Sequence, residues 1–275
     1  MATRIICDTN VWYQLGRHGI SGIKQFLPDS KLLITQLTYF ELITTHNIDS
    51  NFNIVKDANI AIQKHGTFII ANDIQHVLRV FETQFIEYRG VDCKEIMLNI
   101  NREIINADSS INLQYNYDEV SVGRREAAKR IAEQINNFIV DNLKKKMTED
   151  TFRHFVAYCL RRDTLLYLCR HRVVLKHHLF RVLSLNAYKK YFPLYINAFA
   201  GFLFTVYNKR KKKIPMKVSE NDYIDFRNLI YCTGECKYLT LESTSGNRIG
   251  GMLKKHGNSY VYEHTEKIRT ILNVL

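Results

Sequence analysis

Along the first 88 residues, short apolar runs alternate with segments in which apolar residues recur at helical spacing. Ile5, Ile6 and Cys7 form a run that is too short for a helix and rich in β-branched residues, which predicts a strand over residues 3–7. Two similar runs predict strands at 31–35 and 67–71. Helices are expected in the following segments: from about Val11 onward, 37–45, 53–65, and from the capping pair Asn72 and Asp73 through Phe85.

The pattern changes over residues 89–214, where strand signals are sparse and helical periodicity dominates. After residue 214 the earlier alternation returns, with predicted helices at 222–231 and 265–272 and predicted strands at 237–241 and 259–262. We therefore expect an α/β fold in which a parallel sheet is flanked by helices. Residues 1–88 and 215–275 would form this discontinuous core, and residues 89–214 would form a large all-helical insertion.

One apolar run inside the predicted insertion resembles a membrane segment only superficially. Residues 191–207 contain no charge, but a membrane-spanning helix needs about 20 apolar residues, and Pro193 and Asn197 weaken the case further. We expect a buried helix and no membrane attachment. The N-terminal apolar run stops at Asp8, too early for a signal peptide. The cysteines lack the spacing of a disulfide framework, so free thiols and a cytoplasmic location are expected.

Basic residues are concentrated in the predicted insertion. The chain has a formal net charge of +12, and its segment 144–213 holds 17 basic residues against 3 acidic ones. The predicted α/β part is neutral, with 15 residues of each sign. Such a confined positive field favours a polyanion as partner, most simply nucleic acid. The residues expected to bind it are Lys209, Arg210, Lys211, Lys212, Lys213, Arg161, Arg162, Arg170 and Arg172.

Four acidic residues occupy comparable places in the predicted α/β part. Asp8 and Glu242 end predicted strands, and Glu41 and Asp225 lie near the starts of predicted helices. In a parallel sheet these positions share one edge, so the four carboxylates could meet in one cleft. Carboxylates held together repel one another, and a hard cation such as Mg²⁺ or Mn²⁺ relieves the repulsion. Asp222, one turn before Asp225, is either a further ligand or a helix cap, and Asp8 also suits capping.

In these residues the chain resembles the PIN-domain nucleases. The resemblance rests on Asp8-Thr9-Asn10, on Glu41, on Asp225 at the start of a helix, and on Thr240-Leu241-Glu242. It covers the predicted α/β part of the chain. Glu242 stands where aspartate is usual in the family, which lengthens that ligand by one methylene. The insertion between Glu41 and Asp225 is far longer than the family's usual connection.

The resemblance implies a metal-dependent endonuclease. Its four acids would hold Mg²⁺ or Mn²⁺, which orients and deprotonates a water for attack on a phosphodiester, leaving a 5′-phosphate. RNA is the expected substrate. A role as a toxin or defence effector, held by an inhibitor or a complex partner protein, would also follow. The side chains expected to position the carboxylates or the water are Thr9, Asn10 and Thr240.

Two alternative functions stay open at this point. Arg172 and His177 fit the Arg-x4-His pattern of HEPN ribonucleases, which cleave RNA without a metal. The other alternative is a non-catalytic nucleic-acid-binding protein on a degenerate PIN scaffold. Glu242, the residue that departs from the family pattern, leaves this second alternative open.

Overall fold

The computed structural model describes residues 3–19, 29–44, 48–69, 71–81, 93–114, 117–171, 179–234, 236–242 and 246–256. Within these residues four strands form one parallel sheet in the order β3-β2-β1-β4. The predicted α/β class is thereby confirmed. The strands are β1 (Thr3–Cys7), β2 (Ser30–Thr35), β3 (Gly66–Ile69) and β4 (Lys237–Leu239).

Helices make up most of the remaining described chain. The 3₁₀ turns are η1 (Ser110–Asn112) and η2 (Leu229–Tyr231). The α-helices are α1 (Thr9–His18), α3 (Gln36–Ile43), α4 (Ile48–His65), α5 (Asp73–Phe81), α6 (Cys93–Asn106), α7 (Tyr117–Asp141), α8 (Glu149–His171), α9 (Leu179–Leu183), α10 (Leu185–Tyr191), α11 (Pro193–Lys211), α12 (Glu220–Asn228) and α13 (Ile249–His256).

Most of the predicted elements appear with small shifts at their ends. The strand at 3–7 is confirmed, whereas the helix expected from Val11 begins earlier, at Thr9, because Asp8 is its N-cap. The helix expected at 222–231 is α-helical only as far as Asn228 and ends in the 3₁₀ turn η2. The strand expected at 259–262 and the helix expected at 265–272 lie outside the described residues.

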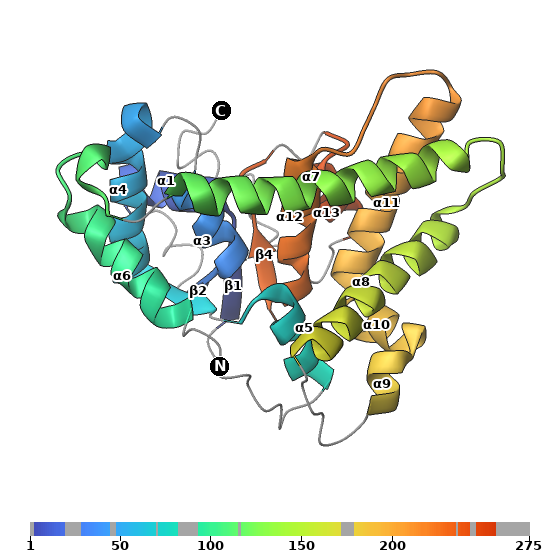
Figure 1. Ribbon diagram of the computed structural model, residues 1–275, viewed down its shortest axis with the longest axis horizontal. Coiled ribbons are helices and arrows are strands. Elements are labelled where there is room, and N and C mark those ends of the chain that lie inside the picture. The colour runs from blue at the N-terminus through green and yellow to red at the C-terminus, as the bar shows by residue number, and fades with distance from the viewer. Residues whose placement is uncertain are drawn as a thin grey trace.

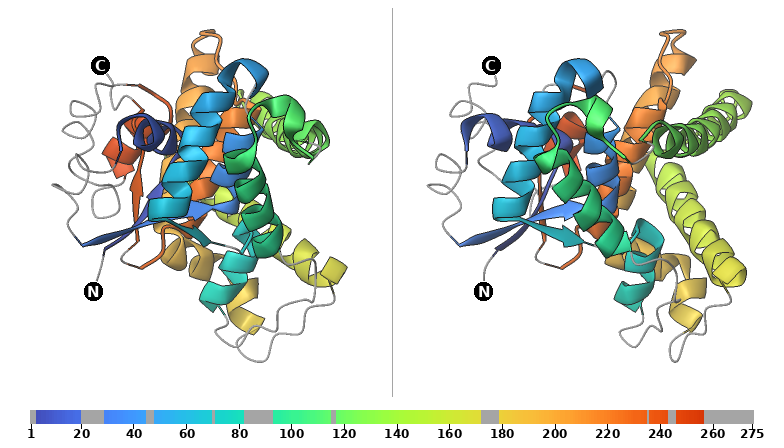
Figure 2. Two further views of the ribbon diagram at one scale, coloured as in Figure 1. Left: turned by 90° about the vertical axis from the view of Figure 1, so that its left-hand side faces the viewer. Right: turned by 60° about the vertical axis from the view of Figure 1, so that its left-hand side comes forward.

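Alternating strand residues point into two separate hydrophobic cores. Ile5 and Cys7 of β1 pack with α1, α4 and α6, while Ile6, between them in sequence, packs with α8, α11 and α12. This is the period-two alternation of a strand that is buried on both faces. Figures 1 and 2 show the same layers, with α4 and α6 on one side of the sheet and α8 and α11 on the other.

The helices of residues 93–211 share these cores with the sheet. Helix α6 is tied to the α/β part by a buried polar network in which Asn59 accepts hydrogen bonds from Asn101 (2.7 Å) and Tyr39 (3.2 Å). Helix α11 is buried along most of its length, which confirms the buried helix expected at 191–207. No helix among the described residues is long and apolar enough to cross a membrane.

Helix α7 connects the two sides of the molecule. It runs across the front of the view in Figure 1, from the side of α4 and α6 to the side of α11, and packs against α3 and α12. At its far end Asn136 holds the chain that leads into α12, since its amide nitrogen donates to the Val218 carbonyl at 2.8 Å. The Asn136 side-chain oxygen accepts from the Val218 amide at 3.1 Å.

The contact between α1 and α4 leaves no room for a side chain at Gly16. A Cβ atom there would lie 2.6 Å from the backbone nitrogen of Ala58 and from the backbone carbonyl carbon of Asp57. Because backbone atoms cannot rotate away, we expect Gly16→Ala to lower the free energy of unfolding by about 1–3 kcal/mol. Urea denaturation measures this, with Arg17→Ala on the exposed face as control, for which a change within about 0.5 kcal/mol is expected. Equal stability of Gly16→Ala and the wild type would contradict the close packing.

Candidate functional site

Asp8 lies buried at the carboxyl end of β1 and uses both of its side-chain oxygens. Oδ1 accepts the Thr9 backbone N–H at 2.8 Å and caps α1. Oδ2 accepts from the Thr240 hydroxyl at 2.8 Å and from the Asn10 amide at 3.3 Å. Asp8 can therefore cap α1 and belong to the acidic site at the same time, because Oδ1 makes the cap and Oδ2 accepts from Thr240 and Asn10.

Asn10 joins the ends of the two neighbouring strands β1 and β4. Its side-chain oxygen accepts the Leu241 backbone N–H at 3.1 Å, and its nitrogen donates to the Thr240 hydroxyl at 3.4 Å. The same Thr240 oxygen accepts the Glu242 backbone N–H at 3.2 Å. These bonds fix the chain that leads from β4 to Glu242 against the carboxylate of Asp8.

Glu41 reaches the site from α3, the helix that follows β2. Its Oε2 accepts a hydrogen bond from the Thr9 hydroxyl at 2.8 Å. Thr9, Asn10 and Thr240 thus each donate to a carboxylate, as expected of groups that hold the acids in place.

Asp225 shows that the acids lie together. Burial and the nearby charges of Glu41, Asp8 and Glu242, with a further contribution from Asp222, hold its pKa well above the ordinary value of 3.8. Like charges raise a carboxyl pKa only at short range. Helix α12 therefore carries Asp225 to the same edge of the sheet as the other acids.

Asp8 and Glu242 also have perturbed pKa values. Burial raises the pKa of Asp8, against the hydrogen bonds from Thr240 and Thr9 that lower it. Burial and the charge of Asp8 raise the pKa of Glu242, whereas the Gly250 N–H and the charge of Arg248 lower it. Glu242 is thus bonded to the first turn of α13, a position that favours a negative charge.

Asp222 is engaged in capping α12. Its Oδ2 accepts from the Ser219 backbone N–H at 2.9 Å and from the Ser219 hydroxyl at 2.6 Å, and the Ser219 oxygen accepts the Asp222 N–H at 3.1 Å. This is a reciprocal capping box. The other oxygen of Asp222 lies 3.9 Å from Arg248. Asp222 thus has the geometry of a helix cap, and its charge also contributes to the raised pKa of Asp225.

Tyr238 is a component of the site that the sequence patterns did not single out. Its side chain is fully buried, and the charges of Asp8, Asp225 and Glu41 act on its hydroxyl, adding to burial in raising its pKa well above 10.0. The hydroxyl lowers the pKa of Asp8, yet makes no hydrogen bond of normal geometry within the described part of the chain. The sequence signal for Tyr238 is its position two residues before Thr240, because residues two apart in an extended chain point to the same side.

A second missed group is a buried polar network below the acids. Asn228 accepts hydrogen bonds from the hydroxyls of Thr35 (2.7 Å) and Thr38 (3.2 Å), which joins α12 to the carboxyl end of β2. The amide nitrogen of Asn228 is buried without a hydrogen-bond partner among the described residues. Asn228 lies three residues after Asp225 and hence on the same face of the helix.

The donor set suits a divalent cation in its chemistry. The converging groups are carboxylates, which are the hard oxygen ligands that Mg²⁺ and Mn²⁺ prefer, and their mutual repulsion is the cost that a cation would remove. Within the residues that the structure describes, no three His, Cys, Asp or Glu side chains stand as a ready-made metal site.

Several basic residues expected to bind nucleic acid are already engaged inside the protein. Arg210 donates to the Met216 carbonyl at 2.6 Å and to Asn136 at 3.1 Å. Arg161 donates to the Leu183 carbonyl at 3.0 Å, and Arg162 pairs with Asp163 at 3.2 Å. The exposed members of the expected set are Lys211, Lys212, Lys213, Arg162 and Arg170. Arg172 and His177 lie outside the described residues.

A basic cleft adjoins the acids. It has a volume of about 650 Å³, and its charged wall consists of Arg210, Lys217, Arg248 and Asp222. Lys217 is exposed, and the Arg248 side chain is 71% exposed. Asp222 and Arg248 of the cleft act on the charges of Asp225 and Glu242, so the cleft lies close to the acidic site.

Comparisons with protein-family models, curated proteins and solved structures give no match to this chain. The resemblance to PIN-domain nucleases therefore stays a prediction. It is carried by the residues of the chain and by their arrangement at the edge of the sheet.

The raised pKa of Asp225 gives a pH dependence with a definite sign. The folded protein binds a proton there more readily than the unfolded chain, so the repulsion that costs stability grows as the pH rises above 3.8. In chelator, we expect Asp225→Asn to raise Tm at pH 7 by at least about 2 °C, the effect of about 1 kcal/mol in a protein of this size. The gain should shrink toward pH 4.

Thermal melts at several pH values measure this effect. The matched control is Asp57→Asn, which removes an exposed carboxylate from α4. Parallel curves of Tm against pH for Asp225→Asn and the wild type would contradict the repulsion.

Proposed function

We propose that the protein is a metal-dependent endonuclease that hydrolyses phosphodiester bonds, with RNA as the favoured substrate. The observation that supports this most is the gathering of four carboxylates at the carboxyl edge of a parallel sheet. Hydrogen bonds from Thr9 and Thr240 hold Glu41 and Asp8 there, and the raised pKa of Asp225 agrees with this arrangement. Ligand sites of open α/β sheets lie at this edge. A structural role does not account for acids that destabilise one another.

In this proposal Asp8, Glu41, Asp225 and Glu242 hold Mg²⁺ or Mn²⁺. The bound ion would supply an activated water and neutralise charge on the leaving oxygen. The chain's own groups do the positioning. The hydroxyls of Thr240 and Thr9 donate to Asp8 and Glu41, which holds these carboxylates in place. The buried side chain of Tyr238 lies beside Asp8.

The substrate backbone would lie in the basic cleft beside Asp222. Lys217 and Arg248 provide exposed positive charge within reach of the acids, and phosphates are what such charge binds. Arg210, which is held by Asn136 and Met216, forms the rigid base of the cleft. The exposed lysines Lys211 to Lys213 lie at the end of α11 and extend the positive field.

The central prediction concerns Asp8. Cleavage of single-stranded RNA should require Mg²⁺ or Mn²⁺, stop in chelator, and fall at least ~100-fold in Asp8→Asn, because the substitution removes a ligand charge while keeping the side chain's shape. Asp57→Asn is the matched control and should cleave at the wild-type rate. A gel assay of product formation measures both.

The same assay separates the alternatives. Activity that persists in chelator and is lost in His177→Ala would favour the HEPN-like mechanism and contradict the proposal. Glu242, which stands where aspartate is usual in the family, is the feature that leaves a non-catalytic scaffold open. Calorimetry decides that case: a wild type that binds Mn²⁺ no better than Asp8→Asn would indicate a degenerate site.

A further prediction concerns the cleft. In an Asp8→Asn background, the pair Lys217→Gln and Arg248→Gln should weaken RNA binding for all sequences. It should flatten the slope of log K against log salt by about 1.4, since each lost phosphate contact to a single strand removes about 0.7. The control pair Lys64→Gln and Lys254→Gln removes the same charge from exposed positions outside the cleft. Filter binding at several salt concentrations measures the slopes, and equal slopes for both pairs would place the RNA elsewhere.

A further inference from the structure

A second cavity, distinct from the acidic site, lies between α7 and α8. These helices meet at the turn 142–148 and run apart from it, and α11 and α12 form the floor between them (Figure 1). The cavity has a volume of about 200 Å³. That is room for one small ring system, because pockets for drug-sized molecules start at about 300 Å³.

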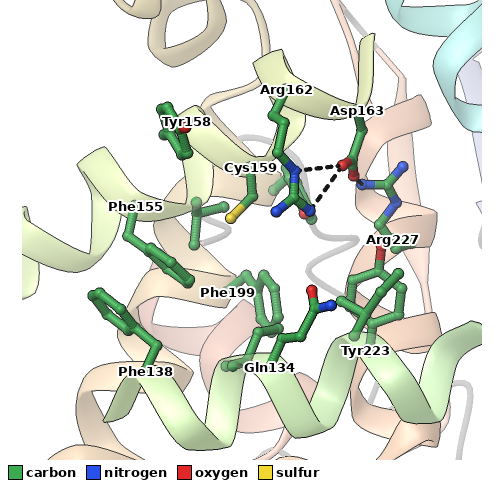
Figure 3. A pocket seen from close by; sticks show the side chains of 14 residues that line it. Gln134, Phe138, Phe155, Tyr158, Cys159, Arg162, Asp163, Phe199, Tyr223 and Arg227 are labelled. Atoms are coloured by element: carbon green, nitrogen blue, oxygen red, sulfur yellow. Dashed lines mark hydrogen bonds and ion pairs between the residues drawn. The ribbon is translucent and has the colours of Figure 1, made fainter. Parts of the chain in front are cut away.

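The walls of this cavity are flat and aromatic. At its narrow end Phe138 and Phe155 stack with ring centroids 4.0 Å apart and an interplanar angle of 7°. Phe199 and Tyr223 form the floor (Figure 3). Burial raises the pKa of the Cys159 thiol to about 11, so this group presents an uncharged sulfur at neutral pH. Such walls select a planar apolar face.

The opposite end of the cavity is polar and electrically balanced. Asp163 pairs there with Arg162 at 3.2 Å and with Arg227 at 3.3 Å (Figure 3), and Arg227 also pairs with Asp73 of α5. Two guanidinium groups are thus matched by two carboxylates. A charged ligand would add an unmatched charge beside the buried guanidinium of Arg227, which is costly. An uncharged ligand with adjacent donor and acceptor groups fits, since the carboxylate has lone pairs left and the guanidinium groups have N–H groups left.

We propose that this cavity binds a nucleobase: a neutral, planar heteroaromatic ring with hydrogen-bond donors and acceptors along one edge. The ring would lie against the aromatic walls, as unstacked bases do on aromatic side chains, with its polar edge toward Asp163 and Arg162. The base could come from a free nucleoside or from an RNA chain. The sugar would stay near Gln134 of α7, an exposed residue whose side chain points into the space between α7 and α8 (Figure 3).

The site is independent of the nuclease proposal but is mechanically joined to the acids. Tyr223 and Arg227 of α12 line the cavity, and Asp222 and Asp225 of the same helix belong to the acidic region. A base in the cavity therefore contacts the helix that positions these carboxylates. Binding itself needs no metal and no cleavage.

Ligand-observed saturation-transfer NMR with adenosine, guanosine, cytidine and uridine tests the site. At least one nucleoside should bind the wild type. The exposed Gln134→Trp would cover the mouth and should weaken that binding at least about tenfold. Asn137→Trp places the same ring at an exposed position of α7 away from the cavity and should bind as the wild type does. No binding to the wild type, or equal binding to both variants, would overturn the proposal.

Two further measurements complete the design. Millimolar nucleoside should slow alkylation of Cys159 in the unaltered protein and leave that of the exposed Cys169 unchanged, as read by mass spectrometry; an unchanged Cys159 rate would also overturn the proposal. A trinucleotide RNA added in the same titrations identifies the source of the base. Tighter binding of the trinucleotide than of the nucleoside, lost in Gln134→Trp, assigns the site to an RNA chain, and equal binding of both assigns it to free nucleosides.

Discussion

Repulsion among carboxylates at one edge of the sheet is the constraint on which the site depends. Burial raises the pKa of Asp8, and burial together with neighbouring charges raises the pKa values of Asp225 and Glu242, so the folded protein carries a cost that an uncharged site would not have. Hydroxyl and backbone donors offset part of it at Asp8 and Glu242. The fold keeps this arrangement because β1, β4 and α12 are fixed by extensive burial elsewhere.

Local patterns were enough to predict the sheet and its acids. The β-branched run before Asp8, and the capping preference of Asp8 itself, are properties of adjacent residues, and the observed β1 and α1 follow them. The meeting of Asp8 with Asp225 needed only the rule that parallel strands end at one edge, whereas the order of the strands was not predicted. The place of Glu242 was equally predictable, but its bond to Gly250 was not, because that contact depends on how α13 returns to the sheet.

What the sequence could not supply are contacts between distant segments. Arg210 belongs to a run that looks like a free basic patch, yet its guanidinium is held by Asn136, 74 residues away. Asn228 carries no charge and fits no motif, but it joins α12 to β2. The predicted insertion was recognised by its charge and by its scarcity of strand signals. The charge and the scarcity of strand signals describe the exposed face of this segment. Its buried face packs into the same two hydrophobic cores as the sheet.

Helix α12 connects the buried face of the helical segment to the acidic site. Its capping box fixes the first turn, Asn228 fixes the last turn to β2, and the buried Arg227 fixes its side to α5 and α8. Removing one partner from a buried ion network leaves an uncompensated charge, so breaking the contacts of Arg227 is costly. Tyr223 and Arg227, which line the second cavity, stand on the same helix as Asp225. A ligand in that cavity would therefore contact the helix that positions this acid, without passing through the substrate cleft.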